Sequence, residues 1–277
     1  MVRTLDQITA ATRRKVLDAK HSWDRRHLEA LAERHIPRGF RHRLEARSQA
    51  GPAVIGELKK ASPSRGLIRS DFDPRNLAIE LEQAGAAALS VLTDEEFFQG
   101  SLANLRSASA STVLPCLRKD FIVDETQVLE ARANQADAIL LIVAALSQAE
   151  LKMLAGRAGE YDLDVLCEVH DREEVQRAID AGCNLIGVNN RDLRTFAVDI
   201  GTALRLADFI PTEAVRVAES GIHSGAEIAQ LRGAGYQAFL IGESLMREKS
   251  PGTALRALLA EARSPGTIKR EREVGRS

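Results

Sequence analysis

Charged side chains recur at the ends of short apolar runs in this sequence, where they could act together. Five of them have types suited to proton transfer: Glu57, Lys59, Lys119, Glu168 and Glu219. Lysine and glutamate held close together shift each other's pKa values, so one site can supply both an acid and a base near neutral pH. A single charged residue at such a position is commonly part of a structural ion pair, but five on one rim favour a catalytic site.

Glycines at the ends of two later runs indicate an anion site. Gly221 follows the run that ends at Glu219, and Gly242 follows Phe239-Leu240-Ile241. Glycine allows backbone N–H groups to approach an anion closely, although it is also the ordinary residue of turns. The sequence contains no GxxxxGK[ST] motif and no GxGxxG motif after a predicted strand, so a phosphate site is expected rather than a nucleotide site.

Eight apolar runs would position these residues. They are continuous rather than alternating, as in parallel strands buried on both faces, and cover residues 54–58, 88–92, 113–118, 138–143, 164–169, 185–189, 215–219 and 238–242. Successive runs begin roughly 21 to 34 residues apart, which leaves room for one crossover helix each. The pattern predicts a (β/α)8 TIM barrel, whose active site would lie at the carboxyl ends of the strands. The alternative, a doubly wound open sheet, more often has six strands or fewer.

Helix signals agree with eight units. The stretches 147–150, 171–174 and 224–227 resemble capping boxes, and Asp73 precedes a proline at a first helical position. A repeat of roughly 50 residues places short turn sequences before four strands, where a helix would turn into the barrel floor. These sequences are Ala84-Gly85-Ala86, Asn134-Gln135-Ala136, Ala181-Gly182-Cys183 and Ala234-Gly235-Tyr236.

Two segments fall outside the barrel units. Residues 1–50 are predicted to form a charged helical extension that is anchored on the barrel by Trp23 and Phe40. Residues 51–263 would form the catalytic barrel. Residues 264–277 are polar and charged, which predicts a mobile tail.

Composition limits the classes of partner. The 277 residues include 38 basic and 39 acidic ones, a formal net charge of −1, and only 4% are aromatic. Neither a basic surface nor a stacking surface for nucleic acid is therefore expected, and no apolar run is long enough to cross a membrane. Three cysteines without CxxC spacing favour neither a disulfide framework nor a zinc site. These features predict a cytoplasmic protein.

The residues of the predicted rim resemble those of the indole-3-glycerol-phosphate synthase family. The matching stretches occur in the family's order along residues 53 to 246: GELKKASPSRG (56–66), FDP (72–74), SVLTDEEFFQGS (90–101), LRKDFIVD (117–124), ILLIVAAL (139–146), EVHD (168–171), GVNNRDLRTFAVD (187–199), AESGI (218–222) and FLIGESLM (239–246). One such motif could occur by chance, but their distribution over six or more separate loops is highly specific.

The resemblance implies a carboxy-lyase of tryptophan biosynthesis. Its substrate would be 1-(2-carboxyphenylamino)-1-deoxyribulose 5-phosphate, and its products indole-3-glycerol phosphate, carbon dioxide and water. Neither a metal nor an organic cofactor is expected. The expected binding partner is this phosphorylated small molecule. Other enzymes of the tryptophan pathway are expected as further partners. The resemblance also implies that the N-terminal extension packs over the barrel mouth.

The resemblance also implies catalytic roles. Lys119 would be the general acid that protonates the ketone oxygen as the ring closes, and Glu168 would act in the proton transfers of dehydration. Lys59 and Glu57 would form a pair near the substrate carboxylate and carbonyl. Three further residues would hold the reacting chain and complete the polar wall: Asn189, Glu219 and Ser220.

Substrate-binding residues follow in the same way. Phe98 and Phe121 would sandwich the aromatic ring over Leu140. The phosphate would meet four residues: Ser62, Arg191, Gly221 and Gly242. Some family members have Ser where this chain has Glu243, and a carboxylate repels phosphate. We therefore expect Glu243 to contribute only its backbone N–H and to point away.

Two other functions remain open from the residues alone. Another phosphate-binding barrel, such as a phosphoribosyl isomerase, needs one acid and one base, which leaves the paired lysines and the sequence KKASPS unexplained. A non-catalytic barrel that serves as a binding scaffold would be expected to lack Lys119 or Glu168, and both are present.

Overall fold

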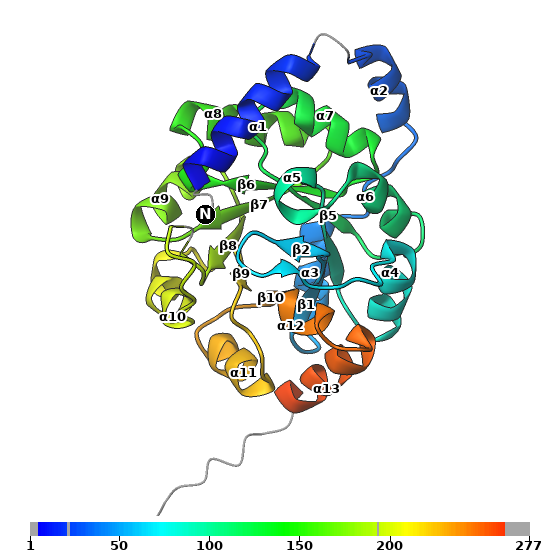
Figure 1. Ribbon diagram of the computed structural model, residues 1–277. Coiled ribbons are helices and arrows are strands. Elements are labelled where there is room, and N and C mark those ends of the chain that lie inside the picture. Colours follow the sequence, from blue (N-terminus) through cyan, green and yellow to red (C-terminus); the bar gives the residue numbers. More distant parts are fainter. Residues whose placement is uncertain (1–4, 21–22, 193, 264–277) are drawn as a thin grey trace, which may run out of the picture.

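The strands close into a barrel. The computed structural model describes residues 5–20, 23–192 and 194–263, so the predicted tail at 264–277 lies outside the described residues. Eight parallel strands follow the order β1-β10-β9-β8-β7-β6-β5-β4 around the ring (Figure 1). They are β1 (Ala53–Leu58), β4 (Ala88–Leu92), β5 (Cys116–Lys119), β6 (Ala138–Ile142), β7 (Asp164–Val169), β8 (Leu185–Asn189), β9 (Val215–Glu219) and β10 (Ala238–Ile241).

Helices alternate with these strands and surround them, which confirms the predicted TIM barrel. They are α4 (Pro74–Gln83), α5 (Glu95–Phe98), α6 (Leu102–Ser109), α7 (Glu125–Ala133), α8 (Gln148–Glu160), α9 (Arg172–Asp180), α10 (Gly201–Leu206), α11 (Gly225–Gly233), α12 (Glu243–Met246) and α13 (Pro251–Arg263). Two 3₁₀ turns, η1 (Val143–Ala145) and η2 (Ala207–Phe209), and a small hairpin of β2 (Ala61–Ser62) and β3 (Gly66–Leu67) lie in connecting segments. None of the described helices is both long and apolar enough to cross a membrane.

One predicted strand boundary is wrong. The run 113–118 looks like a strand from its first residue, but β5 begins at Cys116. Val113 is 75% exposed, and Thr112 folds back so that its hydroxyl accepts the N–H of Leu114. Pro115 lacks the N–H group that a strand ladder requires. The apolar letters before Cys116 therefore belong to a turn.

The predicted helix signals correspond to observed caps and turns. Complete capping boxes begin α8 at Ser147 and α11 at Ser224, and Asp73 caps α4 with Pro74 in its first turn. The third predicted box, at Asp171, is only half formed, because Glu174 bonds His170 instead of the capping residue. The four repeated turns each have a left-handed residue at the same place: Gly85 (φ 96), Gln135 (φ 66), Gly182 (φ 80) and Gly235 (φ 93). This conformation ends the helix and directs the chain into the next strand.

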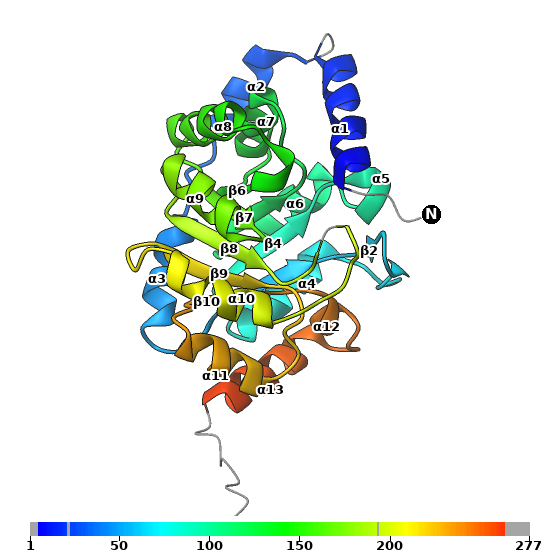
Figure 2. The same cartoon turned by 90° about the vertical axis from the view of Figure 1, so that its left-hand side faces the viewer.

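Three helices precede the barrel and lie on different sides of it. They are α1 (Leu5–Ala19), α2 (Arg25–Ala32) and α3 (Phe40–Ser48). In Figure 2, α1 stands beside α5 and β2, at the carboxyl ends of the strands, whereas α3 covers the opposite end. Phe40 and Leu44 of α3 are fully buried in the cluster of inward-facing strand residues that fills the barrel.

The expectation that the whole extension packs over the mouth is therefore wrong for α2 and α3. Leu28 and Leu31 of α2 pack beside Leu129 and Tyr161, near α7 and α8 on the outside of the barrel. Phe40 is an anchor, as predicted, but at the floor. Trp23 is only half-buried. Amphipathic sequence alone cannot say which end of a barrel a helix will cover.

Arg38 ties the extension to the barrel floor. Its guanidinium donates to both carboxylate oxygens of Asp137 at 2.5 to 3.1 Å, and its N–H donates to the same group at 2.7 Å. Asp137, just before β6, also accepts the N–H of Cys116 at 2.6 Å. The Asp137 side chain is completely buried, so this cluster fixes α3 beneath the strands.

Candidate active site

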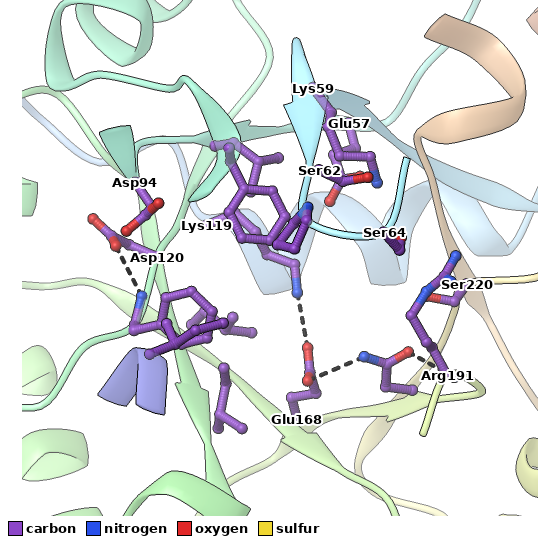
Figure 3. Close-up of a pocket in the computed structure, with 18 of the residues that line it drawn as sticks. Glu57, Lys59, Ser62, Ser64, Asp94, Lys119, Asp120, Glu168, Arg191 and Ser220 are labelled. Atoms are coloured by element: carbon purple, nitrogen blue, oxygen red, sulfur yellow. Dashed lines mark hydrogen bonds and ion pairs between the residues drawn. The ribbon is translucent and has the colours of Figure 1, made fainter. Parts of the chain in front are cut away.

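Lys119 lies at the centre of the mouth. It ends β5, and its Nζ lies 2.8 Å from Oε2 of Glu168 on β7 and 3.1 Å from Oε2 of Glu219 on β9. Figure 3 shows the lysine directed toward Glu168 inside the pocket. Both carboxylates are buried. Glu168 and Glu219 lie 49 and 100 positions after Lys119 in the sequence, and both contact its ammonium group.

Two glycines make room for the carboxylates. A Cβ on Gly187 of β8 would collide with Oε1 of Glu219, and a Cβ on Gly242 would collide with Oε2 of Glu57. Interior positions of a barrel normally carry side chains that fill it. Because Gly187 and Gly242 have no side chain, the carboxylates of Glu219 and Glu57 have room in the apolar interior.

A second ion pair and an amide complete the polar floor. Lys59 Nζ lies 2.5 Å from Oε2 of Glu57, so the expected Lys59–Glu57 pair forms. Asn189, at the end of β8, donates from Nδ2 to Oε1 of Glu168 at 3.1 Å and accepts the N–H of Arg191 at 3.0 Å. Glu168 is thereby held from two sides, by Lys119 and by Asn189.

The two carboxylates beside Lys119 have different proton affinities. Although burial by itself favours the protonated form, Lys119 and His170 lower the pKa of Glu168. Burial raises the pKa of Glu219, and repulsion from Glu168 adds to this rise, while Lys119 opposes it only partly. Burial likewise disfavours the charged lysine, but the three surrounding glutamates raise the pKa of Lys119. At neutral pH the site therefore combines a charged ammonium, an ionised Glu168 and a Glu219 that can hold a proton.

All fifteen predicted site residues line one of two adjoining hollows at this end of the barrel. The first hollow, with about 910 Å³ of empty space including its open mouth, is lined by twelve of them. Glu219, Gly221 and Gly242 line only the second hollow. Seven predicted residues line both, so the hollows join: Glu57, Lys59, Lys119, Asn189, Arg191, Ser220 and Glu243.

One end of this joint cavity is apolar. Phe98, Phe121 and Leu140 line it together with Leu5 and Ile8 of α1. The two phenylalanine rings lie 6.2 Å apart between centroids at an interplanar angle of 40°. Rings at this separation contact each other directly. As they lie here, they form one tilted wall rather than the two faces of a slot for a third ring.

The other end is polar and built from backbone turns. Ser220 and Gly221 both have positive φ values (65 and 75), as in a tight turn, and glycine in such a turn allows a ligand to approach the backbone closely. Ser62 has a buried hydroxyl oxygen without a hydrogen-bond partner among the described residues. Such groups are suited to an anion.

Glu243 does not point away from the cavity as expected. Its carboxylate lies 3.2 Å from Arg65, 3.1 Å from Arg247 and 3.6 Å from Arg191. Arg65 and Arg191 line the polar hollow themselves. Glu243 is thus neutralised by arginines at the edge of the anion end, and its charge does not stand alone there.

The sequence matches a known protein family over nearly its full length. That family is indole-3-glycerol phosphate synthase, and the match extends over residues 5–258. The chain belongs to this family. The predicted function as an indole-3-glycerol phosphate synthase, a carboxy-lyase of tryptophan biosynthesis, is thereby confirmed.

Individual relatives agree with the family match. The indole-3-glycerol phosphate synthase of Koribacter versatilis (strain Ellin345) is 60% identical over 259 residues, covering 94% of this chain and all of the relative. That of Acidithiobacillus ferrooxidans (strain ATCC 53993 / BNL-5-31) is 50% identical, covering 93% and 99%. That of Polaromonas naphthalenivorans (strain CJ2) is 47% identical, covering 93% and 98%.

Solved structures share the barrel at low identity. Thiamine phosphate pyrophosphorylase from Pyrococcus furiosus aligns with a TM-score of 0.56 at 15% identity, over 77% of this chain and 95% of that one. Mandelate oxidase with (S)-2-phenylpropionate aligns with a TM-score of 0.60 at 17% identity, over 76% and 72%. At these identities the likeness shows the fold alone.

Some lining residues of this indole-3-glycerol phosphate synthase barrel carry no sequence signal for the site. Leu5 and Ile8 reach it because α1 folds across the mouth. Arg65 and Phe196 could have been suspected, since they lie in the matched stretches 56–66 and 187–199. Arg118 pairs with Asp120 and Glu130 at 2.9 Å each, so its guanidinium takes part in a buried structural ion pair.

Proposed function

We propose that the joint cavity binds 1-(2-carboxyphenylamino)-1-deoxyribulose 5-phosphate and converts it to indole-3-glycerol phosphate, carbon dioxide and water. The observation that carries this proposal is Lys119, held between Glu168 and Glu219 on the floor of a cavity with one apolar and one polar end. The substrate has the same layout, with an aromatic acid at one end, a phosphate at the other and a ketone between them.

Ring closure needs a proton donor at the ketone. The aromatic carbon attacks the carbonyl carbon, and negative charge develops on the carbonyl oxygen. The Lys119 ammonium is placed to stabilise that charge and to deliver its proton. Its buried carboxylate neighbours keep it charged, so it holds the proton that the ketone oxygen needs.

Dehydration needs a second acid and a base. Two titratable groups whose surroundings separate their pKa values commonly divide these roles. Glu168 stays ionised between Lys119 and His170 and serves as the base. Glu219, whose pKa burial raises, supplies the proton to the departing hydroxyl.

The lining residues indicate where each end of the substrate binds. The aromatic ring lies against the wall of Phe98 and Phe121 over Leu140. The Lys59–Glu57 pair lies near the carboxylate that leaves as carbon dioxide. The phosphate binds the turn at Ser220 and Gly221 together with Ser62, Gly242 and Arg191, where the backbone of Glu243 also contributes.

Incubation of the protein with this substrate tests the proposal. Indole fluorescence should appear, and one proton should be taken up per turnover, because an anionic carboxylate leaves as neutral carbon dioxide. Activity is expected to survive thorough chelation, since no metal is assigned to any step. A failure to form indole, or activity lost to a chelator and restored by one divalent ion, contradicts the proposal.

Glu219→Gln tests the division of roles. The amide keeps the size of the side chain but cannot donate a proton as an acid, so kcat should fall about 100-fold. In the unaltered protein kcat should decline as pH rises through the raised pKa of Glu219, because only the protonated form donates. That decline should be absent from the pH profile of the variant. A decline at the same pH in both proteins assigns it to another group.

Removal of residues 1–20 tests α1 as a cover of the mouth. Leu5 and Ile8 line the apolar end, and Arg13 and Lys20 tie the helix to Glu150 and Asp124 at 2.8 and 2.7 Å. We expect KM to rise about 10-fold from lost apolar contact. The circular dichroism spectrum should lose only the helical signal of α1 itself, because Arg38 and Phe40 remain. Unchanged kinetics would reduce α1 to structural packing.

Two expectations about the cellular setting remain predictions of this proposal. They are a cytoplasmic location and contact with other enzymes of the tryptophan pathway. The phosphoribosyl isomerase and the non-catalytic scaffold are not supported by the family match.

A further inference from the structure

His170 lies beside the substrate cavity and contacts its central carboxylate from behind. The residue follows the end of β7, and its Nε2 lies 3.5 Å from Oε1 of Glu168. That is an ion-pair distance, and the buried Nε2 makes no hydrogen bond among the described residues. His170 lines neither of the two hollows that form the substrate cavity. It lines a separate pocket on the outer side of Glu168.

Glu174 holds the ring in this place. Its carboxylate accepts the backbone N–H of His170 at 2.8 Å and lies 3.0 Å from Nδ1 of the ring. In the boxes that begin α8 and α11, the corresponding glutamate bonds the N–H of the capping residue, and at α11 it also accepts the N–H of His223 just before the cap. At α9 the glutamate is diverted to the histidine, while Asp171 still caps the helix through the N–H of Glu174.

The groups around the ring favour its charged form. Glu168 faces it from β7 and Glu174 from α9, and the outer pocket adds Asp6 of α1, Asp171, Asp192 and one cation, Arg194. Although burial opposes protonation, the carboxylates of Glu168 and Glu174 raise the pKa of His170 to about 10. At neutral pH the ring is an imidazolium between two carboxylates.

We propose that His170 is a positioning residue for Glu168, which it keeps ionised and oriented toward Lys119 and Asn189. This inference rests on the proposed function, in which Glu168 is the base of dehydration. Lys119 contacts Oε2 of Glu168, whereas His170 and Asn189 approach Oε1. Glu219 has the lysine beside Oε2, and its Oε1 has no hydrogen-bond partner among the described residues. The imidazolium and the Asn189 amide thus distinguish the surroundings of the two carboxylates, and of these two groups only the imidazolium carries a charge.

The distance of 3.5 Å between Nε2 of His170 and Oε1 of Glu168 leaves room for this contact to tighten. Hydrogen bonds in catalytic sites are often long before substrate binds and shorten in the complex. A substrate that pushes Glu168 outward would bring Oε1 toward Nε2. The base would then be held more firmly when it is in use.

Two amide variants at this position separate two properties of the ring, its positive charge and its contact with Glu168. Both amides are neutral, and they differ in length. In His170→Asn the amide can replace Nδ1 but is too short to replace Nε2, whereas His170→Gln can still reach Glu168. We expect His170→Asn to lower kcat about 10- to 100-fold through loss of orientation, with KM within twofold. His170→Gln should recover part of kcat.

The acid limb of the pH profile of kcat depends on the positive charge of His170. Loss of an adjacent cation raises the pKa of a carboxylate by about one unit or more, so the acid limb of kcat should move to higher pH in both variants. A merely structural histidine would change the thermal midpoint without moving this limb. Glu174→Gln leaves the ring intact and removes its holder, so it should give a smaller shift in the same direction.

The outcomes distinguish the inference from the proposed function. An unaltered protein that forms no indole contradicts the function, whatever the variants do. An active unaltered protein with both kcat and the acid limb unchanged in His170→Asn overturns the role of His170. If that variant fails to fold, an unchanged limb in both His170→Gln and Glu174→Gln overturns it equally. Nitrogen NMR of the ring adds a readout independent of activity, since a neutral ring at pH 7 contradicts the proposal.

Discussion

Lys119→Ala is expected to reduce kcat on the order of 1000-fold while substrate still binds. The ammonium is used mainly when charge develops on the ketone oxygen, so its loss should affect kcat far more than KM. Binding contacts at the aromatic wall and the phosphate turn lie elsewhere in the cavity and remain. Steady-state kinetics with saturating substrate, together with a direct binding titration, measure the two effects separately.

Controls are needed because the lysine also neutralises its neighbours. Its removal leaves Glu168 and Glu219 close together with less compensation, which lowers stability as well as activity. Lys119→Gln keeps most of the side-chain length without the charge, and circular dichroism should confirm that both variants are folded. Lys152→Ala, at an exposed position on α8, controls for the loss of a surface lysine. A kcat in Lys119→Ala equal to that of the unaltered protein would exclude the lysine as the acid.

Asp137→Ala is expected to cause the largest loss of stability among single substitutions at the barrel floor. The change removes one partner of a buried ion pair. Arg38 keeps only neutral acceptors on Ser109 and Thr112, and the N–H of Cys116 loses its carboxylate acceptor. Breaking such a pair from one side costs about 3 to 5 kcal/mol. The Arg38 side chain is 22% exposed, so the lower end of this range is expected. Urea unfolding at pH 7 measures the shift, with exposed Glu173→Ala as control.

The same substitution has a defined pH dependence. Although burial opposes ionisation, bonds from His35 and Arg38 lower the pKa of Asp137 below its usual value of 3.8. Its stabilising contribution is therefore complete above about pH 4 and is lost as pH falls through the lower native pKa. The difference between the two proteins should stay constant from pH 7 to pH 5 and shrink below pH 4. Equal unfolding midpoints of the two proteins at pH 7 would show that the contacts of Asp137 with Arg38 and Cys116 do not stabilise the fold.

Much of this fold could be predicted because its signals are local. A strand buried on both faces needs a continuous apolar run, and a helix that follows it needs a cap, as at Ser147 and Asp73. The start of β5 was misplaced because Val113 and Leu114 have strand-like side chains in a turn. Only the turn geometry and Pro115 reveal the difference.

The active site could be predicted as a set of residues but not as an arrangement. Strand ends share one rim, which places Lys119, Glu168 and Glu219 near each other. The shared ammonium depends on barrel closure and on the space left at Gly187, which no local pattern encodes. The pairing of Glu243 with arginines from three segments was missed for the same reason. The contact of His170 with Glu168 could not be predicted either, because it depends on Glu174, which holds the histidine ring.

Closure of the ring between β1 and β10 has a consequence for synthesis of the chain. Ala53 pairs with the strand that begins at Ala238, so this edge of β1 stays unpaired until that strand leaves the ribosome. At about 5 to 20 residues per second, the roughly 185 intervening residues take about 10 to 40 s to appear. During that time an apolar strand edge is open to pairing with other chains. The newborn protein is therefore most prone to aggregate, and most in need of a chaperone, in the interval just before its last strand emerges.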